Sequence, residues 1–149
     1  MIKDLIEMRG DVTVQLFDKD GNVKDSRQIK NMVVTAGKQF IAASMLKTTT
    51  NSPVAMSHMA LGSDNTAAAI GNTGLGTELG RASLDSATVS GAVVTYTATF
   101  GPTVATGAVV EAGIFNASSS GTMLCRTVFS VVNKGDDDTM SITWQITVS

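Results

Sequence analysis

Few residues of this chain have the types and the spacing that catalysis or metal binding requires. His58 is the only histidine, and the sequence signals no nucleophile, carboxylate or metal-ligating partner for it. Cys125 is the only cysteine, so no intramolecular disulfide can form, and its alternating apolar surroundings predict a buried thiol. We therefore expect no catalytic residue, no metal site and no cofactor.

Two short motifs share features with ligand-binding loops, but each lacks a required residue. Residues 71–80, GNTGLGTELG, contain spaced glycines without the Gly-Lys-Ser/Thr ending of a phosphate-binding loop. Residues 18–22, DKDGN, have the acidic spacing of a calcium loop, but Arg27 stands where that motif needs a glutamate. The second motif instead predicts a hairpin turn, because Gly21 can adopt the positive φ that such turns need.

Glu111 is the acidic residue with the most unusual setting, since it lies within the apolar run VVEAGIF. A buried carboxylate without a partner costs several kcal/mol, so we expect it to be paired. Arg81 and Arg126 both adjoin strand-like segments, and either could be the partner. The sequence predicts a structural ion pair that fixes strand register, formed by Glu111 with Arg81 or Arg126, rather than a catalytic acid.

The elements that must position these residues are β-strands. Residues 93–100, VVTYTATF, and 140–149, MSITWQITVS, alternate strictly between apolar and polar side chains. A period of two places alternate side chains on opposite faces of a strand, which predicts one buried and one solvated face for each segment. We expect the core to contain five aromatic residues: Trp144, Tyr96, Phe100, Phe115 and Phe129.

Turn signals divide the chain into about eight or nine strands, with one amphipathic helix near residues 36–46. The fold class that follows is mainly β, a single-domain antiparallel β-sandwich of jelly-roll-like type with one short helix. A chain of 149 residues is long enough for one such core. Residues 1–10 are expected to form an N-terminal arm or a short helix, and residues 11–149 the sandwich domain.

The charge composition and the hydropathy bear on two classes of partner, nucleic acid and membrane. The net charge is −2 and only 16% of residues are charged, with no basic patch to attract nucleic acid. No apolar run approaches the roughly 18 residues that a membrane span needs. We therefore expect neither nucleic acid nor membrane among the partners.

A collinear series of segments between about residues 30 and 148 carries a family resemblance. The segments read NMVVTAGKQFIA, MSHMALGS, TAAAI, NTGLGTELGRASL, VTYTATF, EAGIFNASSSGTMLCRTVF and DTMSITWQITV. Together they resemble a family of small virion proteins of tailed bacteriophages. The middle and C-terminal segments are also similar to the particle-proximal domain of phage tail-collar and tail-fibre proteins.

The resemblance implies a non-enzymatic structural protein, an accessory subunit docked on the particle as a tail-fibre, collar-type or adaptor component. A capsid decoration (cement) protein is the alternative, because a tail fibre would continue into a shaft beyond Ser149. A carbohydrate-binding module is a third possibility. Sugar sites usually stack aromatic rings on the ligand, however, and Trp144 and Tyr96 both fall on apolar strand faces.

The resemblance also implies a location in the virion, after synthesis in the host bacterial cytoplasm. The implied partners are other virion proteins of the tail or capsid, together with further copies of the chain as a homo-oligomer. Two segments are candidates for the interface: the apolar N-terminus, and the nearly uncharged loop at 64–76, which has no evident place in the core and is expected to order against another chain. The interface candidates are Ile2, Leu5, Ile6, Asp64, Asn65, Asn72 and Leu75.

Overall fold

The computed structural model describes residues 6–46 and 53–149, and these contain nine strands and one helix. The elements are β1 (Met8–Phe17), β2 (Val23–Lys30), β3 (Met32–Val33), α1 (Thr35–Ser44), β4 (His58–Gly62), β5 (Glu78–Ser90), β6 (Val93–Phe100), β7 (Gly107–Phe115), β8 (Met123–Lys134) and β9 (Thr139–Val148). The expected mainly β fold with one short helix is confirmed.

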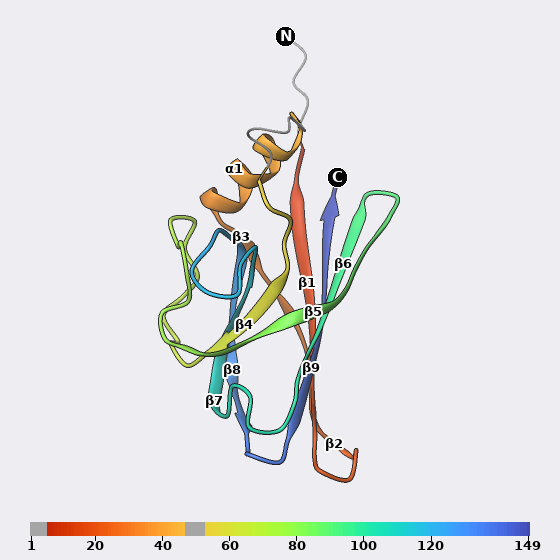
Figure 1. Ribbon diagram of the computed structural model, residues 1–149, viewed down its shortest axis with the longest axis vertical. Coiled ribbons are helices and arrows are strands. Elements are labelled where there is room, and N and C mark those ends of the chain that lie inside the picture. The colour runs from red at the N-terminus through yellow and green to blue at the C-terminus, as the bar shows by residue number, and fades with distance from the viewer. Residues whose placement is uncertain (1–5, 47–52) are drawn as a thin grey trace.

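The strands form one antiparallel sheet that bends back on itself into a nearly closed, barrel-like sandwich (Figure 1). The strand order is β2-β1-β9-β6-β5-β4-β7-β8-β3. β5 links the two layers, because its first half pairs with β4 and its second half with β6. The sandwich therefore has a continuous corner at β5 and a seam where β2 approaches β8.

The seam is closed by two side chains rather than by a strand ladder. The Arg27 guanidinium on β2 donates hydrogen bonds to the backbone oxygens of Ser130 and Val131 on β8, at 2.5 and 3.0 Å. The Thr127 hydroxyl of β8 donates to the backbone oxygen of Lys30 at 2.8 Å. These contacts satisfy carbonyl groups that would otherwise be left at an unpaired strand edge.

The core lies between the layers and takes the inward faces of the alternating strands. The structure buries Trp144, Phe100, Phe115 and Phe129. Tyr96 is an exception, since it is only half-buried at the edge of this cluster. It lies opposite the exposed Ala87, in a part of β6 that extends past the cover of the second layer. Alternation alone could not show where that cover ends.

The expected boundary between a separate N-terminal arm and the domain, at residue 10, is wrong. Met8 and Arg9 already belong to β1, where they lie opposite Val148 and Thr147 of β9. Glu7 continues this pairing through two backbone hydrogen bonds with Ser149, at 2.7 and 2.9 Å. A strand ladder with β9 thus holds residues that the sequence pattern assigned to an arm.

Candidate functional site

The candidate site is built on a buried ion pair between β7 and β8. The Nε atom of Arg126 donates to the Oε1 atom of Glu111 at 3.1 Å. Glu111 is 0% and Arg126 2% exposed. Arg126 lies opposite Gly113 in the β7–β8 ladder, two residues from Glu111, so the two long side chains meet diagonally on one face.

Arg81, the other expected partner of Glu111, forms a different pair. Its guanidinium binds both carboxylate oxygens of Glu78, at 3.1 and 2.6 Å. Arg81 stands on β5, and β4 separates that strand from β7. The expected pairing of Glu111 with Arg81 or Arg126 is therefore confirmed for Arg126, because the strand order places β4 between Arg81 and Glu111.

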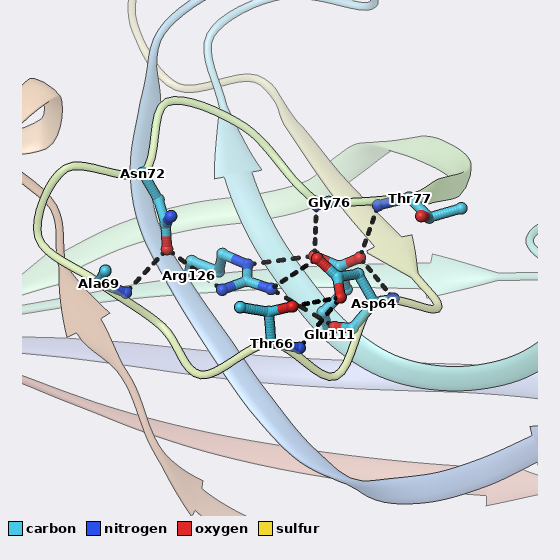
Figure 2. A network of polar contacts seen from close by, with 8 residues as sticks. All are labelled: Asp64, Thr66, Ala69, Asn72, Gly76, Thr77, Glu111 and Arg126. Atoms are coloured by element: carbon cyan, nitrogen blue, oxygen red, sulfur yellow. Dashed lines mark hydrogen bonds and ion pairs between the residues drawn. The ribbon is translucent and has the colours of Figure 1, made fainter.

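The carboxylate of Glu111 also binds three backbone N–H groups of the long loop at 63–77 (Figure 2). Its Oε2 atom accepts from Asp64 at 2.8 Å and from Thr77 at 3.0 Å. Its Oε1 atom accepts from Gly76 at 2.9 Å as well as from Arg126. One buried side chain thus holds both ends of the loop.

Arg126 reaches further along the same loop. Its Nη1 atom donates to the Asn72 side-chain oxygen at 3.1 Å, and that oxygen also accepts from the backbone of Ala69 at 2.8 Å. Its Nη2 atom lies 3.4 Å from the backbone oxygen of Asp64 and 3.9 Å from the carboxylate of that residue. The ion pair therefore binds the loop near its start at Asp64, in its middle at Asn72 and at its end at Gly76 and Thr77.

Two glycines allow the loop to approach this closely. A Cβ atom on Gly62 would lie 2.5 Å from the Glu111 Oε2 atom and 2.5 Å from the backbone oxygen of Thr77. A Cβ atom on Gly76 would lie 1.7 Å from the Asp64 carboxylate. Side chains at these positions would displace the loop from the carboxylate, so Gly62 and Gly76 have a packing role.

The start of the loop is closed by its own acidic residue. The Asp64 Oδ1 atom accepts from the backbone and the hydroxyl of Thr66, at 3.0 and 2.8 Å. These hydrogen bonds, reinforced by the charge of Arg126, lower the pKa of the Asp64 carboxyl below its ordinary value. Asp64 is thus a turn-forming residue as well as a neighbour of the ion pair.

The tip of the loop contacts the helix and borders a groove. The backbone oxygen of Ile70 accepts from the N–H of Thr35, the first residue of α1, at 2.8 Å. The Ile70 side chain remains 60% exposed, and Ile6 beside the same groove is 74% exposed. The groove has a volume of about 610 Å³ and is lined by Ile6, Glu7, Met8, Asn31, Met32, Val33, Lys38 and Ile70.

The seven interface candidates fall into three groups. Ile2 and Leu5 lie outside the described residues, whereas Ile6 and Asn65 are exposed. Asp64, Asn72 and Leu75 turn inward: the first two bind within the loop and Leu75 packs on the cluster around Phe115. The expectation that the loop has no role near the core, and needs another chain to order it, is therefore wrong.

Arg81 organises a second loop, which sequence analysis did not anticipate. Its Nη1 atom donates to the backbone oxygens of Ala117 and Ser120, at 2.9 and 3.0 Å, in the connection between β7 and β8. The guanidinium lies 3.9 Å from the centre of the Phe115 ring. Arginines adjoining strands were the available signal, but their loop partners depend on tertiary structure.

Three further residues that could take part in chemistry, His58, Asp18 and Cys125, have structural roles instead. The ring nitrogens of His58 lie 2.8 Å from the Ser57 hydroxyl and 3.4 Å from that of Ser83. The Asp18 carboxylate accepts from the backbone of Asp20 and Asn22, which closes the β1–β2 turn. Burial raises the pKa of the Cys125 thiol far above its ordinary value, so the thiol stays protonated.

Within the described ranges 6–46 and 53–149, no three potential metal-ligating side chains of His, Cys, Asp or Glu are grouped together. The same residues include no helix long and apolar enough to cross a membrane. Comparison with known proteins found no matching family model, no similar curated protein and no similar solved structure.

Proposed function

We propose that this protein is a non-enzymatic structural subunit of a tailed-bacteriophage particle, which docks on a neighbouring virion protein. The docking surface is the loop at 63–77 and the groove beside it. The observation that carries the proposal is the saturation of Glu111, whose two oxygens each accept two hydrogen bonds. A carboxylate with its acceptor positions filled by backbone N–H groups and arginine holds a loop in place and leaves no oxygen free to take up a substrate proton.

A loop held in this way suits binding. Its conformation is fixed before the partner arrives, so association does not have to order it and loses less entropy. Fixing the loop also leaves the apolar side chain of Ile70 in solvent beside Ile6 and the 610 Å³ groove. Exposed apolar side chains around a concavity are typical of protein–protein contact surfaces.

The family resemblance supports the virion as the place of this contact. Both anchoring residues, Glu111 and Arg126, and most of the clamped loop fall inside the segments that resemble the particle-proximal domain of tail-collar and tail-fibre proteins. A tail-fibre, collar-type or adaptor subunit is thus the favoured role, with a location in the tail, and a capsid decoration protein is the alternative. Trp144 is fully buried, which removes the largest aromatic ring from use in sugar stacking.

The location of the protein in the particle is tested by mass spectrometry of purified particles separated into heads and tails. We expect the chain in the tail fraction at a fixed ratio to other tail proteins. Recovery with the heads would identify the decoration alternative. A chain that stays in the lysate and is missing from both fractions would contradict the proposal.

The docking surface is tested by loading purified protein onto particles that lack it. Ile70→Glu introduces a charge into the proposed contact and should reduce occupancy strongly. Val23→Glu is the matched control, since Val23 is 57% exposed on β2 outside the groove. Deletion of residues 1–5 tests the N-terminal candidates Ile2 and Leu5 without removing any residue of β1. Equal occupancy of all variants would move the contact to another face.

A further inference from the structure

The second half of β5 is a strand edge without a partner among the described residues. β4 pairs with β5 only as far as Ser83, and the N–H of Leu84 still donates to the backbone oxygen of Ser57 at 2.9 Å. From there to Ser90, β5 pairs on one side only, with β6. Figure 1 shows these two strands extending together as a hairpin away from the body of the sandwich.

The β5 strand of this hairpin is exposed to solvent on both faces. Every residue from Asp85 to Ser90 is exposed, and Val89 is 71% exposed. On the inward face, Val89 lies opposite Val94, and Ala87 opposite the half-buried Tyr96. The apolar inner surface of the sheet thus continues onto the hairpin beyond the cover of the second layer.

The other two ends of the sheet are protected in ways that this edge is not. β2 has three basic residues, Lys24, Arg27 and Lys30, and the guanidinium of Arg27 caps the seam with β8. β3 is two residues long and leads directly into α1. Short strands and basic side chains are the usual means by which proteins prevent edge-to-edge pairing.

The free segment of β5, by contrast, reads LDSATVS and contains no lysine, arginine or proline. Its one charged residue, Asp85, already accepts a hydrogen bond from the Thr99 hydroxyl at 2.6 Å. An extended edge with β-branched side chains and no basic residue presents unpaired backbone groups to any second strand of matching length.

We propose that this edge pairs with the same edge of a second copy of the chain, antiparallel and about a two-fold axis. An axis at Thr88 brings the two Thr88 residues opposite each other and sets Ala87 against the partner's Val89 on the inward face. It also pairs Ser86 with the partner's Ser90 on the outward face. Every cross-strand pair between residues 86 and 90 is then neutral, and each exposed Val89 gains an apolar neighbour. The same edge of a second copy is therefore the partner that fits this register, because it has the same length and no basic residue.

The register is tested by cross-linking of Thr88→Cys. Directly opposite residues of an antiparallel pair have Cα atoms about 4.5–5.5 Å apart, within the span of a disulfide. The native Cys125 is buried and will not compete. We expect a covalent dimer on mild oxidation, and little dimer from the control Ser26→Cys, an exposed position on β2. Absence of the dimer, or equal cross-linking of both variants, would overturn the proposal.

Sedimentation of the purified protein over a concentration series gives the second test. Val89→Lys places two ammonium groups at the seam and should weaken self-association at least about tenfold. Val23→Lys is the control on the protected edge and should leave self-association unchanged. A wild-type chain that stays monomeric throughout, or a dimer that Val89→Lys leaves intact, would overturn the pairing. Neither result depends on particles, so the proposed docking function is tested separately.

Discussion

Glu111 and Arg126 belong to neighbouring strands, yet most of the hydrogen bonds of the pair go to a loop that is part of neither strand. β7 and β8 are already joined by their backbone ladder. The ion pair adds contacts to the backbone of Asp64, Gly76 and Thr77 and to the side chain of Asn72. The energetic consequence of breaking the pair should therefore appear first in the loop at 63–77.

Glu111→Ala should destabilise the fold by about 3–5 kcal/mol, because it leaves a buried arginine and three backbone N–H groups without their acceptor. Glu111→Gln should cost less, since its amide oxygen can still accept hydrogen bonds. Urea unfolding measures both values, and Asp11→Ala, which breaks an exposed pair with Lys30, is a control expected to cost about 0–1 kcal/mol. Equal stability of both Glu111 variants and wild type would show that the loop is anchored by other contacts.

Trp144→Ala should cost about 3–5 kcal/mol, because it leaves a large cavity beneath a fully buried side chain. Trp144→Phe should cost much less. The indole Nε1 atom has no hydrogen-bond partner among the described residues, so phenylalanine loses volume but no hydrogen bond. Denaturant unfolding compares the two variants. Native tryptophan fluorescence that is red-shifted and readily quenched by acrylamide would contradict the burial on which both expectations rest.

The alternation of side chains was sufficient to predict the strands around Trp144, because a period of two follows from backbone geometry alone. It could not decide between Arg81 and Arg126 as the partner of Glu111. That choice depends on strand order, which places β4 between β5 and β7 and makes β8 the neighbour of Glu111. Strand order is set by tertiary packing and leaves no periodic trace in the sequence.

The loop at 63–77 also shows what the sequence pattern could not predict. Its lack of periodicity correctly predicted an irregular segment, but its small, uncharged residues suggested that nothing in the chain would hold it. Positions 62 and 76 require glycine because the Glu111 carboxylate and the Asp64 side chain lie close to them. That reason is visible only when segments distant in the sequence are brought together.

Acid should destabilise the protein partly through Asp138. Its Oδ2 atom accepts from the Lys24 ammonium at 2.9 Å and from the Gly135 N–H at 2.8 Å, and these bonds lower the pKa of the carboxyl. A carboxyl with a lowered folded pKa stabilises the fold above its unfolded value of about 4 and loses that contribution as the pH falls through the folded value. Asp138→Asn should therefore flatten the decline of unfolding free energy below about pH 4.

Carbon NMR of the Asp138 carboxyl provides the control for this assignment. Lys24→Met removes the largest cause of the shift and should move the pKa of Asp138 back toward its ordinary value. An unchanged titration in Lys24→Met, or an unchanged acid slope in Asp138→Asn, would assign the acid sensitivity to other carboxyls.

Cys125 should produce the opposite dependence at alkaline pH. Burial raises the pKa of its thiol, so the folded chain keeps the proton above pH 9.0, where an ordinary thiol in the unfolded chain loses it. The folded state then binds more protons than the unfolded state, and stability must fall as the pH rises past that value. Lys134 acts with the other sign, because desolvation lowers the pKa of its ammonium and the folded chain releases that proton first.

Subtracting the pH profile of the unfolding free energy of Cys125→Ala from that of wild type removes the Lys134 contribution and leaves the contribution of the thiol. We expect this difference to decline above about pH 9, and the native thiol to resist a disulfide reagent until urea unfolds the chain. A thiol that reacts as fast in the folded protein as in urea would place Cys125 within reach of solvent.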